Sequence, residues 1–185
     1  MARKKQYELI RSARRTLSVE VRVDGTVIVR APKKCPQSEI DWFLKERQDW
    51  IREKLLLMEA RQRDAEKIQP LSEEEQKLSK ETAREALEQK LRYYAPKMGV
   101  TYGRVSVRDQ KTRWGSCSLE GNLNFNWRLL MAPPGVMDYV VVHELAHRKE
   151  MNHSRSFWKV VEETMPDYQK YRNWLKENGN ILHRY

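Results

Sequence analysis

Residues 138–153, DYVVVHELAHRKEMNH, hold three of the four histidines in the chain. His143 and His147 are four residues apart, so on a helix their side chains lie on one face, one turn apart. Glu144 follows at about 100° around the helix axis, too far round to be a ligand but able to reach a water beside the imidazoles. His153 lies beyond the expected helix end and can turn back toward the pair. The pattern predicts a metal site formed by His143, His147 and His153.

The surroundings of these residues favour a catalytic site over a structural one. The apolar residues Val140–Val142, Leu145 and Ala146 make the helix apolar almost all round, which predicts that it is buried. Three protein ligands leave one tetrahedral position for water, and imidazole ligands favour zinc over iron or manganese. The sequence therefore predicts a zinc-dependent hydrolase with Glu144 as the general base. The alternative, an incidental pair of histidines, is disfavoured by the glutamate and the third histidine.

Hydrolysis of a carbonyl compound also needs a donor that stabilises the negative charge forming on oxygen. Arg113, Asn126 and Tyr168 are the candidates for this role. The turn that leads to His153 is expected to place Asn152 in the left-handed backbone region, which asparagine tolerates.

The segment RWGSCS at residues 113–118 has two readings. Trp114 could line the cleft, or it could belong to the core with Gly115 holding a turn. Cys117 could approach the metal as a fourth ligand, although single buried cysteines are usually inert. The fourth histidine, His183, follows Gly179 near the C-terminal end and is interpreted as incidental.

The remaining sequence predicts an α+β fold. We expect an N-terminal antiparallel β unit in which Asp24-Gly25 forms a hairpin turn. A helix is expected to begin near Ser38, capped by that residue with Asp41 in the capping-box position, and another to begin after Ser72 and end at Gly99. Residues 59–67 are read as a fraying helix end or a connector. The domains expected are 1–70, the β unit with its helix, and 71–185, the domain with the histidines. The expected strands are 7–11, 17–23, 26–29, 105–108 and 122–126, and the later helices are 136–151, 155–164 and 167–177.

The composition of the chain limits its possible partners and its location. It has 185 residues, 34% of them charged, and a net charge of +10, with the surplus concentrated in residues 1–63. That basic region could attract a nucleotide or nucleic acid, although a solvated surface is the more common explanation. No apolar run is long enough to cross a membrane, and the basic start lacks the apolar stretch of a secretory signal. With only two cysteines, Cys35 and Cys117, a cytoplasmic location is expected.

At several motifs the chain resembles the YgjP-like metallopeptidases, which are relatives of the WLM and SprT-like zinc proteins. The similarity spans nearly the whole sequence. It implies a minimal gluzincin-like zincin core in which the strand containing LNFN borders the cleft, with His143, His147 and His153 as zinc ligands. The motifs are RSARRTLSVEVRVDGTVIVRAP at 11–32, RWGSCS at 113–118, LNFNWRLLMAP at 123–133, YVVVHELAH at 139–147, NHSRSFW at 152–158 and MPDY at 165–168.

Three functions are compatible with the sequence. The resemblance favours a peptidase that acts on peptides or proteins. A UTP pyrophosphatase is the second alternative, because some relatives carry that label and a metal-activated water can attack phosphorus, but no phosphate-binding glycine-rich loop is present. The third is a nucleic-acid-associated adaptor that retains a metal site. The ligand spacing also equals that of metzincins, but Glu150 stands where those proteins have glycine.

Overall fold

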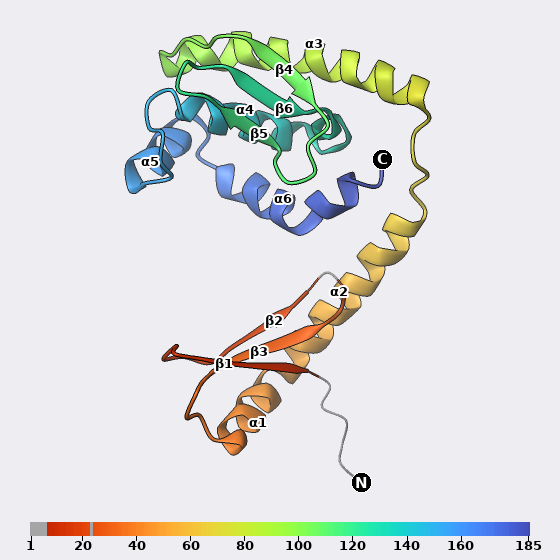
Figure 1. The fold of residues 1–185 in the computed structure, drawn as a ribbon, viewed down its shortest axis with the longest axis vertical. Coiled ribbons are helices and arrows are strands. Elements are labelled where there is room, and N and C mark those ends of the chain that lie inside the picture. Colours follow the sequence, from red (N-terminus) through yellow and green to blue (C-terminus); the bar gives the residue numbers. More distant parts are fainter. Residues whose placement is uncertain (1–6, 23) are drawn as a thin grey trace. The chain divides into compact units, whose positions relative to one another are not determined.

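A computed structural model describes residues 7–22 and 24–185, and the chain divides into two compact units, Met1–Ile68 and Gln69–Tyr185. Both units combine helices with a small β-sheet, so the predicted α+β class is confirmed (Figure 1). No helix in the described residues is both long enough and apolar enough to span a membrane.

The first unit contains a three-stranded sheet, the first sheet, in the order β1-β3-β2. β2 and β3 are antiparallel, as predicted, and Gly25 in their turn has φ 81°. The prediction of an all-antiparallel unit is wrong, because β1 pairs in parallel with the other edge of β3. Apolar alternation identifies a strand but not its direction. Val23, predicted to end the second strand, lies outside the described residues. The strands are β1 Glu8–Ser12, β2 Ser18–Val21 and β3 Val27–Pro32.

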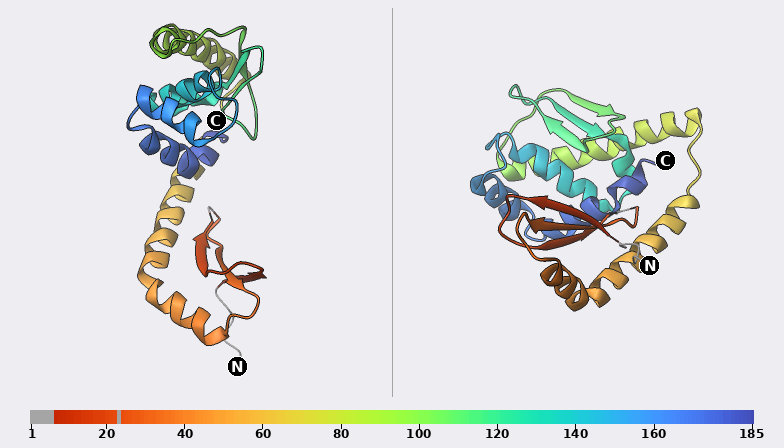
Figure 2. Two further views of the ribbon diagram at one scale, coloured as in Figure 1. Left: turned by 90° about the vertical axis from the view of Figure 1, so that its left-hand side faces the viewer. Right: turned by 60° about the horizontal axis from the view of Figure 1, so that its bottom comes forward.

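Two helices complete this unit, α1 (Gln37–Glu46) and α2 (Gln48–Glu66), and α2 lies beside β2 (Figure 2). The expected Ser38 cap is wrong. Pro36 is the N-cap residue and makes no side-chain cap bond, so Ser38 already lies within the helix. Most of the predicted connector at 59–67 is helical, since α2 continues to Glu66.

The second unit begins with α3 (Glu73–Met98), which has the predicted boundaries. Ser72 and Glu75 form a reciprocal capping box, and Gly99 ends the helix in the left-handed conformation with φ 65°. The other elements are β4 Val105–Arg108, β5 Gly115–Cys117, β6 Leu123–Asn126, the 3-10 helix η1 Trp127–Met131, α4 Pro134–Ala146, α5 Arg155–Thr164 and α6 Tyr168–Leu182.

Its three-stranded sheet, the second sheet, has the order β4-β6-β5, with β4 parallel and β5 antiparallel to β6. The short strand β5 was not predicted, because three residues are too few to show alternation. Helix α4 lies against α3, α5, α6 and β5 (Figures 1 and 2). It is buried along most of its length, as its apolar sequence predicts. The helix that carries two of the candidate ligands is therefore the centre of the second unit's core.

Candidate active site

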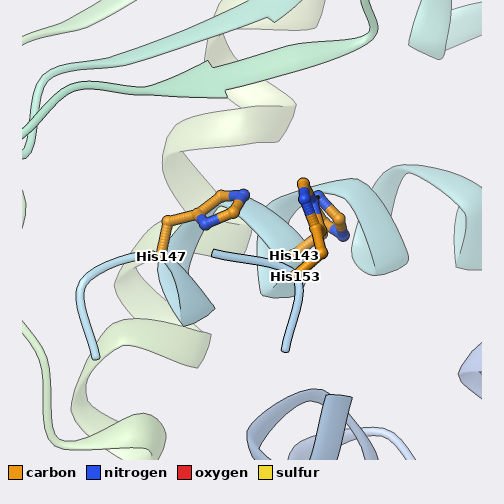
Figure 3. A group of neighbouring side chains, drawn as sticks. All are labelled: His143, His147 and His153. Atoms are coloured by element: carbon orange, nitrogen blue, oxygen red, sulfur yellow. Dashed lines mark hydrogen bonds between the residues drawn. The ribbon is translucent and has the colours of Figure 1, made fainter. Parts of the chain in front are cut away.

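Three histidines from two segments converge at one end of α4. His143 lies in the last turn of the helix, His147 is its C-cap residue, and His153 lies just before α5. One ring nitrogen from each lies within 4.8 Å of the others, and Nε2 of His143 is 2.9 Å from Nε2 of His153. The three rings are turned toward one another (Figure 3). The structure thus brings together the three residues that the spacing selected.

The chain leaves α4 earlier than predicted, at Ala146 instead of Met151. Among the described residues only glycines have positive φ, so the left-handed conformation expected for Asn152 is wrong. The turn after α4 therefore does not require the glycine that metzincins have at the position of Glu150. The Nδ1 atom of His147 lies 3.1 Å from the carbonyl oxygen of Glu150. A proton on Nδ1 would be donated to that carbonyl, which fixes the ring and leaves Nε2 as the ligand atom.

His143 lies deeper in the site and is surrounded by aromatic rings. The rings of Phe157 and Trp158 have their centroids 4.9 and 5.8 Å from that of His143. Burial lowers the pKa of His143 to about 3, helped by the neighbouring His147 and His153. This imidazole is therefore neutral at physiological pH, which is the protonation state that binds a metal.

Glu144 follows His143 in the chain, and its carboxyl group lies in an unusual environment. Its side chain is 4% exposed, and burial raises its pKa to about 8, although the positive charge of Arg113 opposes the shift. A carboxyl group with a raised pKa is a stronger base, once it is ionised, than a carboxylate in water.

Gly115 of β5 lies directly against Glu144. A Cβ atom at this position would come within 2.5 Å of Glu144 Oε1 and 2.7 Å of its Cγ. The carboxyl group fits beside the strand because residue 115 has no side chain. The sequence analysis missed this role, since a turn held by Gly115 was one of its two interpretations of the segment. The available signal was a glycine within a strand, which often marks a close approach.

The rest of the RWGSCS segment anchors β5. The Trp114 ring stacks on His183 with centroids 4.8 Å apart and packs against Gly179 of α6, so Trp114 belongs to the core. His183 is not part of the histidine group that could hold a metal, but it supports this tryptophan. Cys117 also lies outside that group, and burial together with the charge of Glu144 raises the pKa of its thiol.

Two of the candidate oxyanion donors lie in or next to the second sheet. Arg113 lies in the segment before β5, and Asn126 is the last residue of β6. Asn126 is completely buried, and its side-chain amide already bonds to backbone groups. Its Nδ2 donates to the carbonyl of Gln110 at 2.6 Å, and its Oδ1 accepts from the amide of Arg128 at 3.1 Å. Arg113, in the loop that Asn126 holds, is exposed and acts electrostatically on Glu144.

Tyr168, the third candidate, is the first residue of α6 and is buried. Its ring stacks on Tyr139 with centroids 6.4 Å apart and on Trp158 with centroids 5.4 Å apart. Both of these rings contact His143. Tyr168 is therefore one aromatic ring away from the histidine cluster.

The site fits a divalent cation of the kind that imidazoles bind. Two nitrogen ligands of a tetrahedral zinc ion lie about 3.4 Å apart, and the three ring nitrogens here lie within 4.8 Å of one another. Nδ1 of His143 is buried and has no hydrogen-bond partner among the described residues. A neutral imidazole with an unpaired ring nitrogen, beside two further imidazoles, is the donor set that a divalent cation binds.

The chain is similar to known metallopeptidases. The family model of the YgjP-like metallopeptidase domain matches residues 15–77 and 69–178. Abylysin, a metallopeptidase zymogen of Pyrococcus abyssi, is similar at 26% identity, over 51% of this chain and 93% of abylysin, with a TM-score of 0.42. Jannalysin, a zymogen of Methanocaldococcus jannaschii, is similar at 14% identity, over 52% and 95%, with a TM-score of 0.42. No curated protein matches the chain.

Proposed function

Because the chain belongs to the YgjP-like metallopeptidase family, we propose that it hydrolyses peptide bonds with zinc held by His143, His147 and His153 and with Glu144 as general base. Family membership makes it a metallopeptidase whose substrate is a peptide or a protein. The observation that carries the residue assignment is the convergence of three imidazoles beside a buried glutamate.

The chemistry divides between the metal and the protein. When bound, zinc would lower the pKa of a water molecule and polarise the scissile carbonyl. Glu144 would accept a proton from the attacking water and deliver it to the leaving amine. Burial raises the pKa of this carboxyl group in the metal-free protein, which makes the ionised carboxylate a stronger base than an ordinary one. Gly115 supports these steps by leaving room for the carboxyl group.

Among the donor candidates, the contacts favour Tyr168 and Arg113. Tyr168 stacks within the aromatic group around His143, and Arg113 is exposed close enough to affect Glu144. The amide of Asn126 is occupied by backbone partners, so we assign it the role of holding the loop of Arg113 in place.

The family match concerns peptidases and lends no support to the UTP pyrophosphatase or the nucleic-acid adaptor. The pyrophosphatase would release pyrophosphate from UTP and lose this activity in Glu144→Gln. The adaptor would bind DNA or RNA with strong salt dependence, unaffected by that change.

A reducing, cytoplasmic location is proposed because Cys35 and Cys117 are both free thiols.

The test is the substitution Glu144→Gln, which keeps the size of the side chain but removes the base. The native protein should bind about one zinc per chain and cleave peptides, and the variant should keep the zinc while losing at least about 100-fold in kcat. Glu163→Gln is the matched control, because Glu163 is exposed on α5. Peptide cleavage that survives Glu144→Gln would overturn the role of this residue.

A further inference from the structure

An arginine outside the ligand set is held against the aromatic wall of the site. The guanidinium carbon of Arg172 lies 4.3 Å from the centroid of the Trp158 ring. Trp158 in turn has its centroid 5.8 Å from the rings of both His143 and His153. Arg172 and Tyr168 are four residues apart on α6, so they share one face of this helix, and both contact Trp158. A single aromatic ring separates Arg172 from two candidate metal ligands.

The charge of this arginine is not balanced by a neighbouring acid. Arg172 is exposed, and within residues 7–22 and 24–185 it forms no ion pair with an acidic side chain. The unpaired guanidinium lies against the Trp158 ring, and the same ring contacts both His143 and His153.

A guanidinium fixed on an aromatic ring has its N–H groups preorganised for a carboxylate, which it can bind through two parallel hydrogen bonds. The cation–π contact holds the side chain without using its capacity to donate to an anion. Arg113, an exposed residue two positions before the glycine that lies against Glu144, adds a second positive charge. A negatively charged group of a substrate would therefore be attracted to this site and oriented by Arg172.

We propose that Arg172 is a specificity-determining residue that binds a carboxylate of the peptide substrate, either an aspartate or glutamate side chain or the C-terminal carboxylate. This rests on the proposed peptidase function and names the substrate class of the same site. Arg172 is not a zinc ligand and does not touch the reacting carbonyl. It selects which peptides are presented to Glu144 and the metal.

The experiment compares native protein with Arg172→Gln and Arg172→Lys on a library of random N-acetylated peptides. One half of the library has amidated C-termini, and the other half has free C-termini. We expect native protein to favour peptides with a carboxylate at one position, and Arg172→Gln to lose about 10- to 100-fold of that preference. Cleavage of peptides that lack the carboxylate should persist, and Arg172→Lys should restore part of the preference. Preference within the amidated half identifies an acidic side chain, and preference only in the free half identifies the C-terminus.

Arg92→Gln is the control, because Arg92 is an exposed arginine on α3 of the same unit. It should leave the preference unchanged. A native protein without carboxylate preference, or a preference that survives Arg172→Gln, would overturn the proposal. A purely structural role of the cation–π contact would lower cleavage of all peptides equally, which would also overturn it.

A binding measurement separates this proposal from the proposed function. Calorimetry on zinc-loaded Glu144→Gln protein, with and without Arg172→Gln, would use acetyl-alanyl-glutamate and acetyl-alanyl-glutamine amide as probes. The protein with Arg172 should bind the glutamate probe at least about tenfold more tightly than the protein without it, and the amide probe equally. Equal affinity of both proteins for both probes contradicts the role of Arg172 even if peptides are cleaved. Absence of cleavage with selective binding contradicts only the proposed function.

Discussion

The two sheets have the same topology but different neighbours. In each, a central strand pairs in parallel with the first strand and antiparallel with the second, in the orders β1-β3-β2 and β4-β6-β5. The turn of the first sheet contains Gly25, where an added Cβ would meet open space. The edge strand β5 of the second sheet contains Gly115, where a Cβ would collide with Glu144. All four histidines belong to the second unit. The chemistry therefore follows from the side chains beside a strand and not from the topology.

The largest expected effect comes from removing a ligand beside the second sheet. His143→Ala should lower zinc affinity by more than about 100-fold, since even substitutions behind a ligand cost 10- to 100-fold. Peptidase activity should disappear with the metal. His183→Ala, which removes a histidine stacked on Trp114, should keep its zinc. Metal analysis after dialysis measures both. Equal loss of zinc from the two variants would show that the three-histidine cluster is not the binding site.

The convergence of the three histidines agrees with the sequence pattern, whereas other features of the fold differ from it, and both outcomes have physical reasons. The relation of His143, Glu144 and His147 is set by the local geometry of one helix, so spacing alone was sufficient. The parallel pairing of β1 depends on contacts between residues about twenty positions apart, which alternation does not encode. The contact between Gly115 and Glu144 joins a strand of three residues to a distant helix, and its only trace in the sequence is a glycine.

The second prediction substitutes Gly115 in the second sheet and Gly25 in the turn of the first sheet. Gly115→Ala should displace the Glu144 carboxyl and lower kcat by about 100-fold, because a shift of about 1 Å in a catalytic group can have that effect. Zinc binding should be retained. Gly25→Ala should leave kcat unchanged and destabilise the fold by about 1–2 kcal/mol, because Gly25 has positive φ. Steady-state kinetics and urea unfolding test the pair. Unchanged kcat in Gly115→Ala would mean that the carboxyl position is not critical.

The third prediction concerns the stability of the metal-free protein as a function of pH. Burial raises the folded-state pKa of Glu144 to about 8 from an ordinary value of 4.5, so the folded protein holds a proton that the unfolded chain has released. The stability that this contributes is complete below pH 4.5 and is lost as pH rises to about 8. His143 contributes in the opposite sense, because its pKa is lowered to about 3 from 6.5, and its contribution is nearly complete above pH 6.5.

The contribution of Glu144 is therefore best isolated between pH 6.5 and 8. Over this interval of about 1.5 pH units, it should reduce the free energy of unfolding by about 2 kcal/mol. Urea unfolding of the metal-free protein at several pH values would measure the slope, and Glu144→Gln should remove that part of it. An identical slope in the variant would show that the carboxyl group is not desolvated in the folded state.

The smallest effect is expected from two arginines that bind backbone carbonyls in the two units. Arg11 donates through Nη1 to the carbonyls of Pro32, Lys33 and Cys35, next to the first sheet. Arg148, which follows His147, donates through Nε to the carbonyl of Thr101 at 3.0 Å and through Nη1 to that of Leu119 at 2.9 Å.

Substitution of either arginine by glutamine should cost about 1 kcal/mol of stability, since both groups of bonds are partly open to solvent. Only Arg148→Gln should also lower peptidase activity, by several-fold, because Arg148 links the turn between β5 and β6 to the chain next to His147, a proposed ligand. Unfolding curves and kcat/KM for the two variants separate these effects. Equal loss of activity in Arg11→Gln would mean that the first unit takes part in catalysis, and the similarity between the two sheets would then extend beyond topology to function.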